Sequence, residues 1–270
     1  MPDVPSSGSM LETLFLLQSL GFSSSPTFNT PSWSISAELW TYLIFGVFTL
    51  LGGRSRASVY LMVAISILAG YFVYRLNQPL GLFTTLEFGF PRCISGFFLG
   101  CVIWRAWRAT ALRPSEMIMN ALHCLAFCVL VLEFMMIDFN TDWNFCLPPT
   151  FAAVIFLCAI DSGSVLKRML STSFARSMGK LSYSFYMLHT AILIICSFAI
   201  SSTMPSLKFS AFKSATAETL FLGDIAACAY VMLIVVASLW TFRFIENPSR
   251  KWGAKVASRV FGSQKDKPGS

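Results

Sequence analysis

Seven apolar segments, most of them close to the length that crosses a bilayer, constrain this chain more than any other feature. A transmembrane helix needs about 20 mainly apolar residues, with a usable range of about 17 to 25. The segments are bounded by charged residues, prolines and glycines, and they cover residues 35–51, 58–76, 90–107, 117–137, 147–160, 181–200 and 224–244. The sequence therefore predicts an all-α fold, a polytopic integral membrane bundle of about seven transmembrane helices.

The composition agrees with a lipid environment. Charged residues make up 12% of the chain, about half of the roughly 25% that soluble domains carry, which argues against a soluble enzyme. Disorder is excluded because 26 Phe, 7 Trp and 7 Tyr offer more apolar area than an unfolded chain can leave in water. The net charge of +7 is no sign of nucleic acid here, because in a membrane protein the positions of the charges matter more than their sum.

The basic residues alternate along the chain in a way that predicts its orientation. Sixteen of the 20 Lys and Arg residues lie at the ends of the first, third, fifth and seventh segments or in the stretches that follow them, and four lie on the opposite side. Lys and Arg in short loops concentrate on the cytoplasmic side of a membrane. We therefore expect the N-terminus outside and the C-terminus in the cytoplasm.

An outside N-terminus needs a signal that carries it across the membrane. The first 34 residues do not supply one, since they contain no Lys or Arg and lack the features of a signal peptide. An odd number of preceding helices would explain an outside N-terminus, so the sequence resembles the C-terminal part of a larger bundle. We divide the chain into an extracytoplasmic segment (1–34), a partial bundle (35–249) and a basic cytoplasmic tail (250–270) that is helical near 251–260.

Familiar motifs for metals, disulfides and phosphates are absent. The 8 cysteines form no C-x-x-C pair and mostly lie within apolar segments, which argues against a disulfide framework or a zinc site. Nucleophilic triads, phosphate loops and H-E-x-x-H are also missing. We expect no metal and no bound cofactor.

Ionisable residues inside the apolar segments are the candidates for chemistry, because each costs about 2.5 to 3.5 kcal/mol at a helix centre. The predicted orientation places Glu38, Arg92 and Glu133 in one outer layer. A polar cavity with a functional site and a charge pair that joins helices are both open interpretations. Glu133 is interpreted as an interfacial residue that reaches the lipid headgroups.

His189 lies on one helix face with Tyr183 and Tyr186. A neutral imidazole is suited to proton transfer near pH 7, but a membrane histidine also serves as an interhelical hydrogen-bonding group. The second histidine, His123, is interpreted as structural.

Four segments resemble motifs of the membrane acyltransferase 3 family. They are N-T-P-S-W-S-I-S-A-E with Y-L-I-F at 29–45, P-R-C-I-S-G-F-F-L-G at 91–100, G-K-L-S-Y-S-F-Y-M-L-H at 179–189 and F-I-E-N-P-S-R at 244–250. They occur in the family's order and at similar spacing. The family's first helix, with an Arg-rich start followed by a histidine, has no counterpart here, and three absent helices would agree with the odd number inferred from charge.

The resemblance implies a bacterial inner (plasma) membrane protein that moves an acyl group, usually acetyl from acetyl-CoA, to a hydroxyl of a cell-surface glycan or lipid-linked acceptor. The implied membrane partners are lipid, acyl-CoA and this acceptor, with no nucleic acid. Such a transfer needs a base and a group that stabilises an oxyanion, and basic loops could meet the CoA phosphates. The candidate catalytic residues are Glu38, Arg92 and His189, and the candidate substrate-binding residues are Trp33, Ser34, Ser36, Tyr183, Tyr186 and Glu246.

Two other functions stay open at this point. One is a transporter-like bundle that passes a solute along the outer Glu38 and Arg92 layer. The other is a non-catalytic remnant, or a partner subunit that completes a split acyltransferase.

Overall fold

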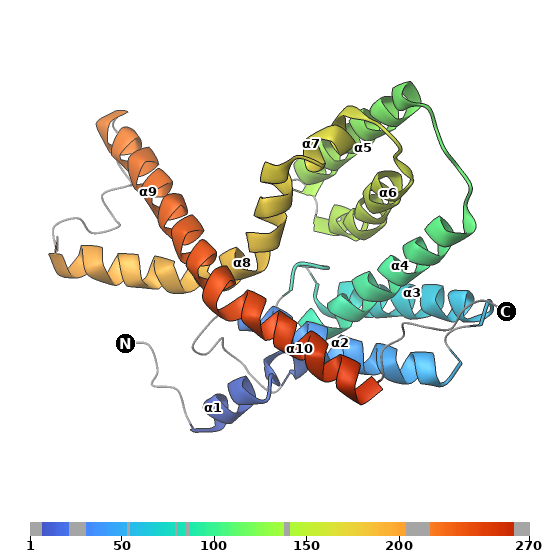
Figure 1. The fold of residues 1–270 in the computed structure, drawn as a ribbon, viewed down its shortest axis with the longest axis horizontal. Helices are drawn as coiled ribbons and strands as arrows, with labels where there is room; N and C mark the ends of the chain where they lie inside the picture. Colours follow the sequence, from blue (N-terminus) through green and yellow to red (C-terminus); the bar gives the residue numbers. More distant parts are fainter. Residues whose placement is uncertain are drawn as a thin grey trace. The chain divides into compact units, whose positions relative to one another are not determined.

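A computed structural model describes residues 7–21, 31–52, 55–78, 80–84, 87–137, 141–203 and 217–261, and every regular element within these ranges is helical (Figure 1). The chain forms two compact units, Met1–Ala175 and Arg176–Ser270, which are described separately. The all-helical fold that the apolar segments predict is confirmed.

The first unit begins with two short elements and continues with longer helices. Its elements are α1 (Ser7–Leu14), η1 (Gln18–Leu20), α2 (Ser32–Leu50), α3 (Ser58–Leu76), α4 (Gly89–Ala109), α5 (Glu116–Ile137), η2 (Thr141–Phe145), α6 (Leu147–Ile160) and α7 (Val165–Leu170). Helix α8 (Ser173–Thr203) leads into the second unit, which also holds α9 (Ala217–Thr241), the π-helical turn η4 (Phe242–Glu246) and α10 (Asn247–Phe261). A helix is present at each of the seven predicted segments.

Six helical stretches in the described part of the chain are long and apolar enough to cross a membrane. They are Ser32–Leu50, Ser58–Leu76, Glu116–Ile137, Asp142–Ile160, Ser173–Ala199 and Gly223–Arg259. In each stretch, at most 22% of the most apolar 18-residue segment is buried inside the protein. Many large hydrophobic side chains are exposed. Such an apolar surface is stable in lipid rather than in water. The chain is therefore a polytopic integral membrane protein.

The predicted segment without a counterpart among these six stretches is 90–107, which corresponds to α4. Its 21 residues give a length of about 31 Å at 1.5 Å per residue, but Arg92, Arg105 and Arg108 lower its hydropathy. Helix α4 packs against α2, α3, α6 and η1. The least apolar long helix of the first unit is thus the one that its neighbours surround.

Helices α3 and α4 approach closely through small residues. The hydroxyl of Ser66 donates to the carbonyl of Ser95, and the hydroxyl of Ser95 donates to the carbonyl of Ser66, both at 2.8 Å. A Cβ added at Gly70 would lie 2.9 Å from the Ser95 hydroxyl oxygen. Small residues and interhelical hydrogen bonds of this kind hold membrane helices together where the hydrophobic effect offers little.

Aromatic rings join α2 to α4. Phe45 packs edge-on against Phe97 with ring centroids 5.1 Å apart, and Phe48 packs in the same way against Phe98 at 5.3 Å. Tyr42 extends this contact one turn earlier, at 5.6 Å from Phe97. These contacts fix which face of α2 meets α4, and therefore where the polar residues near the start of each helix lie.

Candidate functional site

Arg92 lies near the start of α4, where its guanidinium contacts a loop carbonyl and an aromatic ring. One η nitrogen donates to the carbonyl of Leu82 at 3.4 Å, and the guanidinium carbon lies 5.4 Å from the centre of the Trp33 ring. A Cβ added at Gly89 would lie 2.9 Å from that ring, so glycine permits the close approach of α2 and α4. Trp33 therefore orients Arg92 by a cation–π contact.

Glu38 lies on α2 with an exposed side chain, and its carboxylate interacts with the hydroxyl of Tyr42 one turn along. It is also within electrostatic reach of Cys93, the neighbour of Arg92 in α4. No ion pair joins Glu38 to Arg92 in the described part of the structure. The two predicted site residues thus come from packed neighbouring helices without a direct salt bridge.

Asn144, which sequence reasoning missed, supports the loop that carries the Leu82 carbonyl. Its carboxamide oxygen accepts the N–H of Leu82 at 3.0 Å, and its nitrogen donates to the carbonyl of Leu80 at 2.8 Å. Asn144 is 1% exposed. Gly81 has φ +55°, and a Cβ there would lie 2.7 Å from the Asn144 carboxamide oxygen, so the turn requires glycine.

Two further side chains connect the end of α3 to this loop and to η2. The amide nitrogen of Asn77 donates to the carbonyls of Gly81 and Phe83, at 2.8 and 3.0 Å. The hydroxyl of Tyr74 donates to the carboxylate of Asp142 at 2.6 Å. Residues 74–78, 80–84 and 142–144 thus contribute to one hydrogen-bonded network next to Arg92. Isolated Asn, Gly and Tyr residues in the sequence gave no signal for it.

Ser36 is fully buried and anchors the N-terminal segment to α2. Its hydroxyl donates to the carbonyl of Leu16 at 2.6 Å and accepts the N–H of Ser19 at 3.1 Å. The indole of Trp40 donates to the same Leu16 carbonyl at 2.8 Å. Leu16 has a left-handed φ of 52°, a strained conformation for leucine that these hydrogen bonds stabilise.

Ser34 makes a more local contact than Ser36. Its hydroxyl donates to the carbonyl of Pro31 at 3.0 Å, within the first turn of α2. Of the two predicted substrate-binding serines, Ser36 connects distant segments and Ser34 bonds its own helix start.

Glu133 differs from its interpretation as a residue at the lipid headgroups. Its side chain is buried, and the hydroxyl of Thr150 in α6 donates to its Oε1 at 2.7 Å. Its Oε2 is buried and has no hydrogen-bond partner among the described residues. The interpretation was wrong because hydropathy does not show that α6 covers this face of α5. Glu133 joins these two helices.

His189 lies in the second unit, and its hydrogen-bond partners come from that unit. Its Nδ1 contacts the carbonyl of Tyr186 one turn earlier, and its Nε2 lies 3.1 Å from the hydroxyl oxygen of Thr190. The rings of Tyr186 and His189 are 5.6 Å apart. The hydroxyl of Tyr230 in α9 donates to the His189 carbonyl at 2.7 Å. The predicted face of Tyr186 and His189 therefore exists, and Tyr183 on the same helix is about half exposed.

Glu246 ends the π-helical turn η4 and contacts two other helices. The buried hydroxyl of Ser184 in α8 donates to its Oε2 at 2.6 Å. Its Oε1 lies 3.5 Å from Arg250 in α10. Single π-helical turns inside α-helices occur frequently at functional sites. In this unit, Glu246 links α8 to the junction between α9 and α10.

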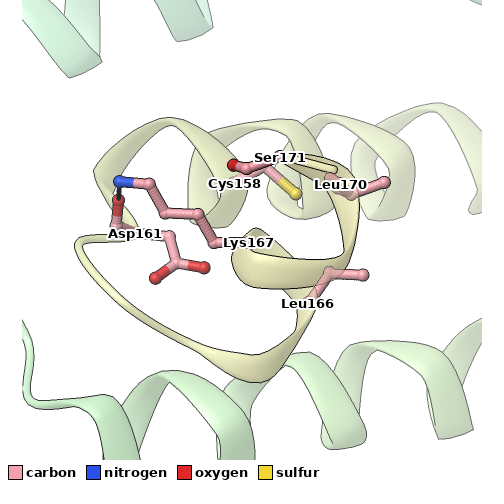
Figure 2. A pocket seen from close by; sticks show the side chains of 6 residues that line it. All are labelled: Cys158, Asp161, Leu166, Lys167, Leu170 and Ser171. Carbon is pink, nitrogen blue, oxygen red and sulfur yellow. Dashed lines mark hydrogen bonds between the residues drawn. The ribbon is translucent and has the colours of Figure 1, made fainter. Parts of the chain in front are cut away.

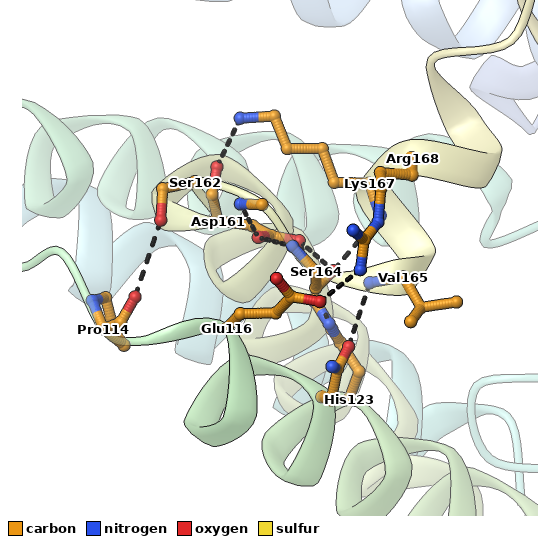
Figure 3. A network of polar contacts seen from close by, with 11 residues as sticks. Pro114, Glu116, His123, Asp161, Ser162, Ser164, Val165, Lys167 and Arg168 are labelled. Carbon is orange, nitrogen blue, oxygen red and sulfur yellow. Dashed lines mark hydrogen bonds and ion pairs between the residues drawn. The ribbon is translucent and has the colours of Figure 1, made fainter.

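A second polar cluster of the first unit, the α5–α7 cluster, surrounds Asp161 at the end of α6 (Figure 3). Asp161 accepts the N–H groups of Gly163 and Ser164, and its other carboxylate oxygen accepts the Ser164 hydroxyl. His123 lies 4.0 Å from the carboxylate, and neither ring nitrogen of this buried side chain has a hydrogen-bond partner among the described residues. Other members are the ion pair of Arg168 with Glu116 and the Val165 N–H bonded to Asn120.

The charge state of Asp161 follows from these partners. Burial alone would raise the pKa of the Asp161 carboxyl. The hydrogen bonds from Ser164 and Gly163, with the nearby His123, outweigh burial and hold the pKa below its ordinary value. Asp161 is thus an anchor for the loop between α6 and α7.

Beside Asp161 is a small pocket of about 160 Å³ (Figure 2). It is lined by Cys158, Asp161, Leu166, Lys167, Leu170 and Ser171. The ammonium of Lys167 donates to the Asp161 carbonyl at 2.7 Å across it. No group of three or more potential metal ligands occurs in the part of the chain that the structure describes, and all 8 cysteines are free thiols.

The fold and these contacts define a class of protein. It is a polytopic helical membrane protein in which charged side chains near the ends of helices make contacts with neighbouring helices. A family model described as "Acyltransferase domain" matches residues 4–252. The chain therefore belongs to this acyltransferase family, and the resemblance seen in its four motifs is confirmed.

Individual relatives are distant and longer than this chain. A Staphylococcus aureus (strain COL) protein with the provisional name O-acetyltransferase SACOL0978 is 24% identical over 241 residues, or 83% of this chain and 36% of that protein. A second relative is the Bacillus subtilis (strain 168) protein YrhL, which is provisionally named a peptidoglycan O-acetyltransferase. It is 25% identical over 252 residues, which cover 86% of this chain and 37% of the length of YrhL.

A third relative is O-acetyltransferase OatA of Staphylococcus aureus (strain NCTC 8325 / PS 47), which is 23% identical over 83% of this chain and 36% of its own length. The chain thus spans little more than a third of the length of the curated relatives it matches. No solved structure matches the chain with comparable significance.

Proposed function

We propose that this protein is a membrane O-acyltransferase that moves an acetyl group from acetyl-CoA to a hydroxyl of a cell-surface glycan. The observation that carries this proposal is the acyltransferase family match over residues 4–252. The names of the relatives support the choice of an acetyl group, and that of YrhL supports a glycan acceptor.

The α2–α4 contact supplies groups that suit acyl transfer. The acceptor hydroxyl must lose a proton as it attacks the thioester, and the exposed carboxylate of Glu38 is the group we assign to accept it. The tetrahedral intermediate carries an oxyanion, which the guanidinium of Arg92 would stabilise. Trp33 and the Leu82 carbonyl hold that guanidinium in place before substrate binds.

His189 and Glu246 would act in the second unit, beside Tyr183 and Tyr186. We assign His189 to general acid–base catalysis, because an imidazole is a side chain suited to proton transfer near neutral pH. The basic residues of the predicted cytoplasmic loops would bind the phosphates of CoA.

We also propose that the protein lies in a bacterial plasma membrane with its C-terminus in the cytoplasm. The support is the concentration of 16 of the 20 Lys and Arg residues on one predicted side. A fluorescent protein fused after Ser270 should mature, because it folds in the cytoplasm. A periplasmic phosphatase fused at the same position should be inactive. An active phosphatase would contradict this orientation.

The test of function is acetyl transfer by the full chain in proteoliposomes. Acetyl-CoA labelled in the acetyl group is supplied with peptidoglycan fragments, and the alkali-labile label on the glycan is counted. We expect transfer by the wild type and a loss of about 100-fold or more for Glu38→Gln and Arg92→Gln, the size seen when one transition-state donor is removed. Matched controls are Asp224→Asn and Arg75→Gln, which remove exposed charges predicted to lie on the same side.

The possible results distinguish an error in the assigned site residues from an error in the assigned reaction. Equal loss in the controls would mean that charge at this membrane face, not the α2–α4 contact, supports transfer. Full activity of Glu38→Gln would contradict its role as the base. The absence of label in every sample, with intact acetyl-CoA, would contradict acetyl transfer by this chain.

A further inference from the structure

Helix α10 leaves the membrane directly from a membrane-spanning helix. The stretch Gly223–Arg259 is 37 residues long, or about 55 Å at 1.5 Å per residue, whereas the hydrocarbon core of a bilayer is about 30 Å thick. Its last turns must therefore lie outside the core. The π-helical turn η4 (Phe242–Glu246) stands at the junction, and π-bulges are places where helices change direction.

The charges of α10 are all of one sign and are arranged in a row. Lys251, Lys255 and Arg259 recur every four residues, and the helix contains no Asp or Glu. Residues four apart lie on one face of an α-helix. The row is therefore a strip of three cations along the helix. Arg250 is not part of it, because it faces Glu246.

An apolar row runs beside the cations. Trp252 and Val256 are also four residues apart, and Trp252 is 70% exposed. Every residue of 251–259 is exposed, so this helix surface is not covered by the other described helices of the second unit. A basic row next to a Trp-containing apolar row is typical of helices that lie in a membrane interface.

We propose that α10 lies along the membrane surface and binds the phosphates of anionic lipid headgroups through Lys251, Lys255 and Arg259. Trp252 and Val256 then enter the boundary between headgroups and acyl chains, while the long Lys and Arg side chains extend to the phosphates. The occupant is lipid because α10 follows a membrane-spanning helix without a break, and because its charge is complementary to an anionic leaflet. The inference depends on α9 crossing the membrane and not on acyl transfer.

The test is amide hydrogen exchange of the full chain in two kinds of lipid nanodisc, one of phosphatidylcholine alone and one with about a third phosphatidylglycerol. Each cation near an anionic surface favours binding by roughly fivefold. We therefore expect exchange within 247–261 to be at least tenfold slower in the anionic discs. This difference should largely disappear in 0.5 M salt, which shortens the Debye length to about 4 Å.

The key variant is the triple substitution Lys251→Gln, Lys255→Gln and Arg259→Gln, which keeps helix propensity while removing the cations. It should exchange equally fast in both discs. A control with the same change in net charge is Arg56→Gln, Arg113→Gln and Arg176→Gln, all exposed and outside α10, and it should behave as the wild type. Unchanged exchange in α3 and α5 reports that each variant is folded.

Two results would overturn the inference. One is the same α10 exchange rate in both discs for the wild type. The other is slow exchange in anionic discs that survives the triple substitution. Replacement of Trp252 by serine should weaken protection in both discs, because it removes the apolar contact and leaves the cations.

Discussion

The carboxamide of Asn144 holds the backbone of Leu82, with its oxygen 3.0 Å from the Leu82 nitrogen. The Leu82 carbonyl in turn accepts a hydrogen bond from Arg92. A buried side chain from η2 therefore fixes the backbone that positions a candidate catalytic cation on α4. The link joins residues 62 positions apart in the chain.

The first prediction concerns this link. Asn144→Leu should lower the free energy of unfolding by about 1 to 3 kcal/mol, because the Leu82 N–H and the Leu80 carbonyl lose their buried partner. Thermal unfolding in detergent, followed by helical circular dichroism, measures the change. Gln78→Leu is the control, since Gln78 is exposed and its amide donates to the carbonyl of Tyr74 in the last turn of α3. Equal effects of the two substitutions would contradict the role of Asn144.

The second prediction separates two neighbouring serines. Ser36→Ala should destabilise the protein by about 1 to 3 kcal/mol, because the buried Ser19 N–H loses its acceptor and the half-buried Leu16 carbonyl loses one of its donors. Ser34→Ala should cost less than about 1 kcal/mol, because the Pro31 carbonyl lies at a helix start. Chemical denaturation of both variants in the same detergent compares them. A larger loss for Ser34→Ala would show that the N-terminal segment does not depend on Ser36.

The helical fold could be predicted because a helix that crosses a bilayer needs about 20 consecutive apolar residues, and such segments are visible in the sequence. The segment 58–76 matches α3 at both ends, and 147–160 matches α6. The start of α8 at Ser173 was not predicted from the segment 181–200. Its first turns contain Arg176 and Lys180. Charged residues lower the hydropathy and so end an apolar segment, but they are compatible with a helix.

The site was only partly predictable. Arg92 and Trp33 were identified from charge and motif, and the structure brings them into contact. Asn144, Tyr74 and Asp142 were missed, because each is an ordinary residue until a turn with a left-handed glycine brings distant segments together. Hydropathy also could not show that Thr150 of α6 meets Glu133.

The third prediction compares the two partners of Glu246. Double-mutant cycles with Ser184→Ala and with Arg250→Gln, each combined with Glu246→Gln, give the two coupling energies. The Ser184 coupling should be about 1.5 to 3 kcal/mol, because a buried hydroxyl donates to a carboxylate. The coupling of Arg250, whose side chain is 68% exposed, should be below about 1 kcal/mol. The reverse order would mean that the ion pair, and not α8, holds the π-helical turn.

The fourth prediction concerns pH and Asp161. Because the folded pKa of Asp161 lies below its ordinary value of about 3.9, the carboxylate contributes stability that is present above that value. This contribution is lost as the pH falls through the folded pKa, since the neutral acid accepts the N–H groups of Gly163 and Ser164 more weakly than the carboxylate does. The melting temperature of the wild type should therefore fall more steeply between pH 5 and pH 3 than that of Asp161→Asn. Asp224→Asn removes an exposed carboxylate and should retain the wild-type slope. Parallel curves for wild type and Asp161→Asn would show that the hydrogen bonds in the loop between α6 and α7 do not depend on the charge of Asp161.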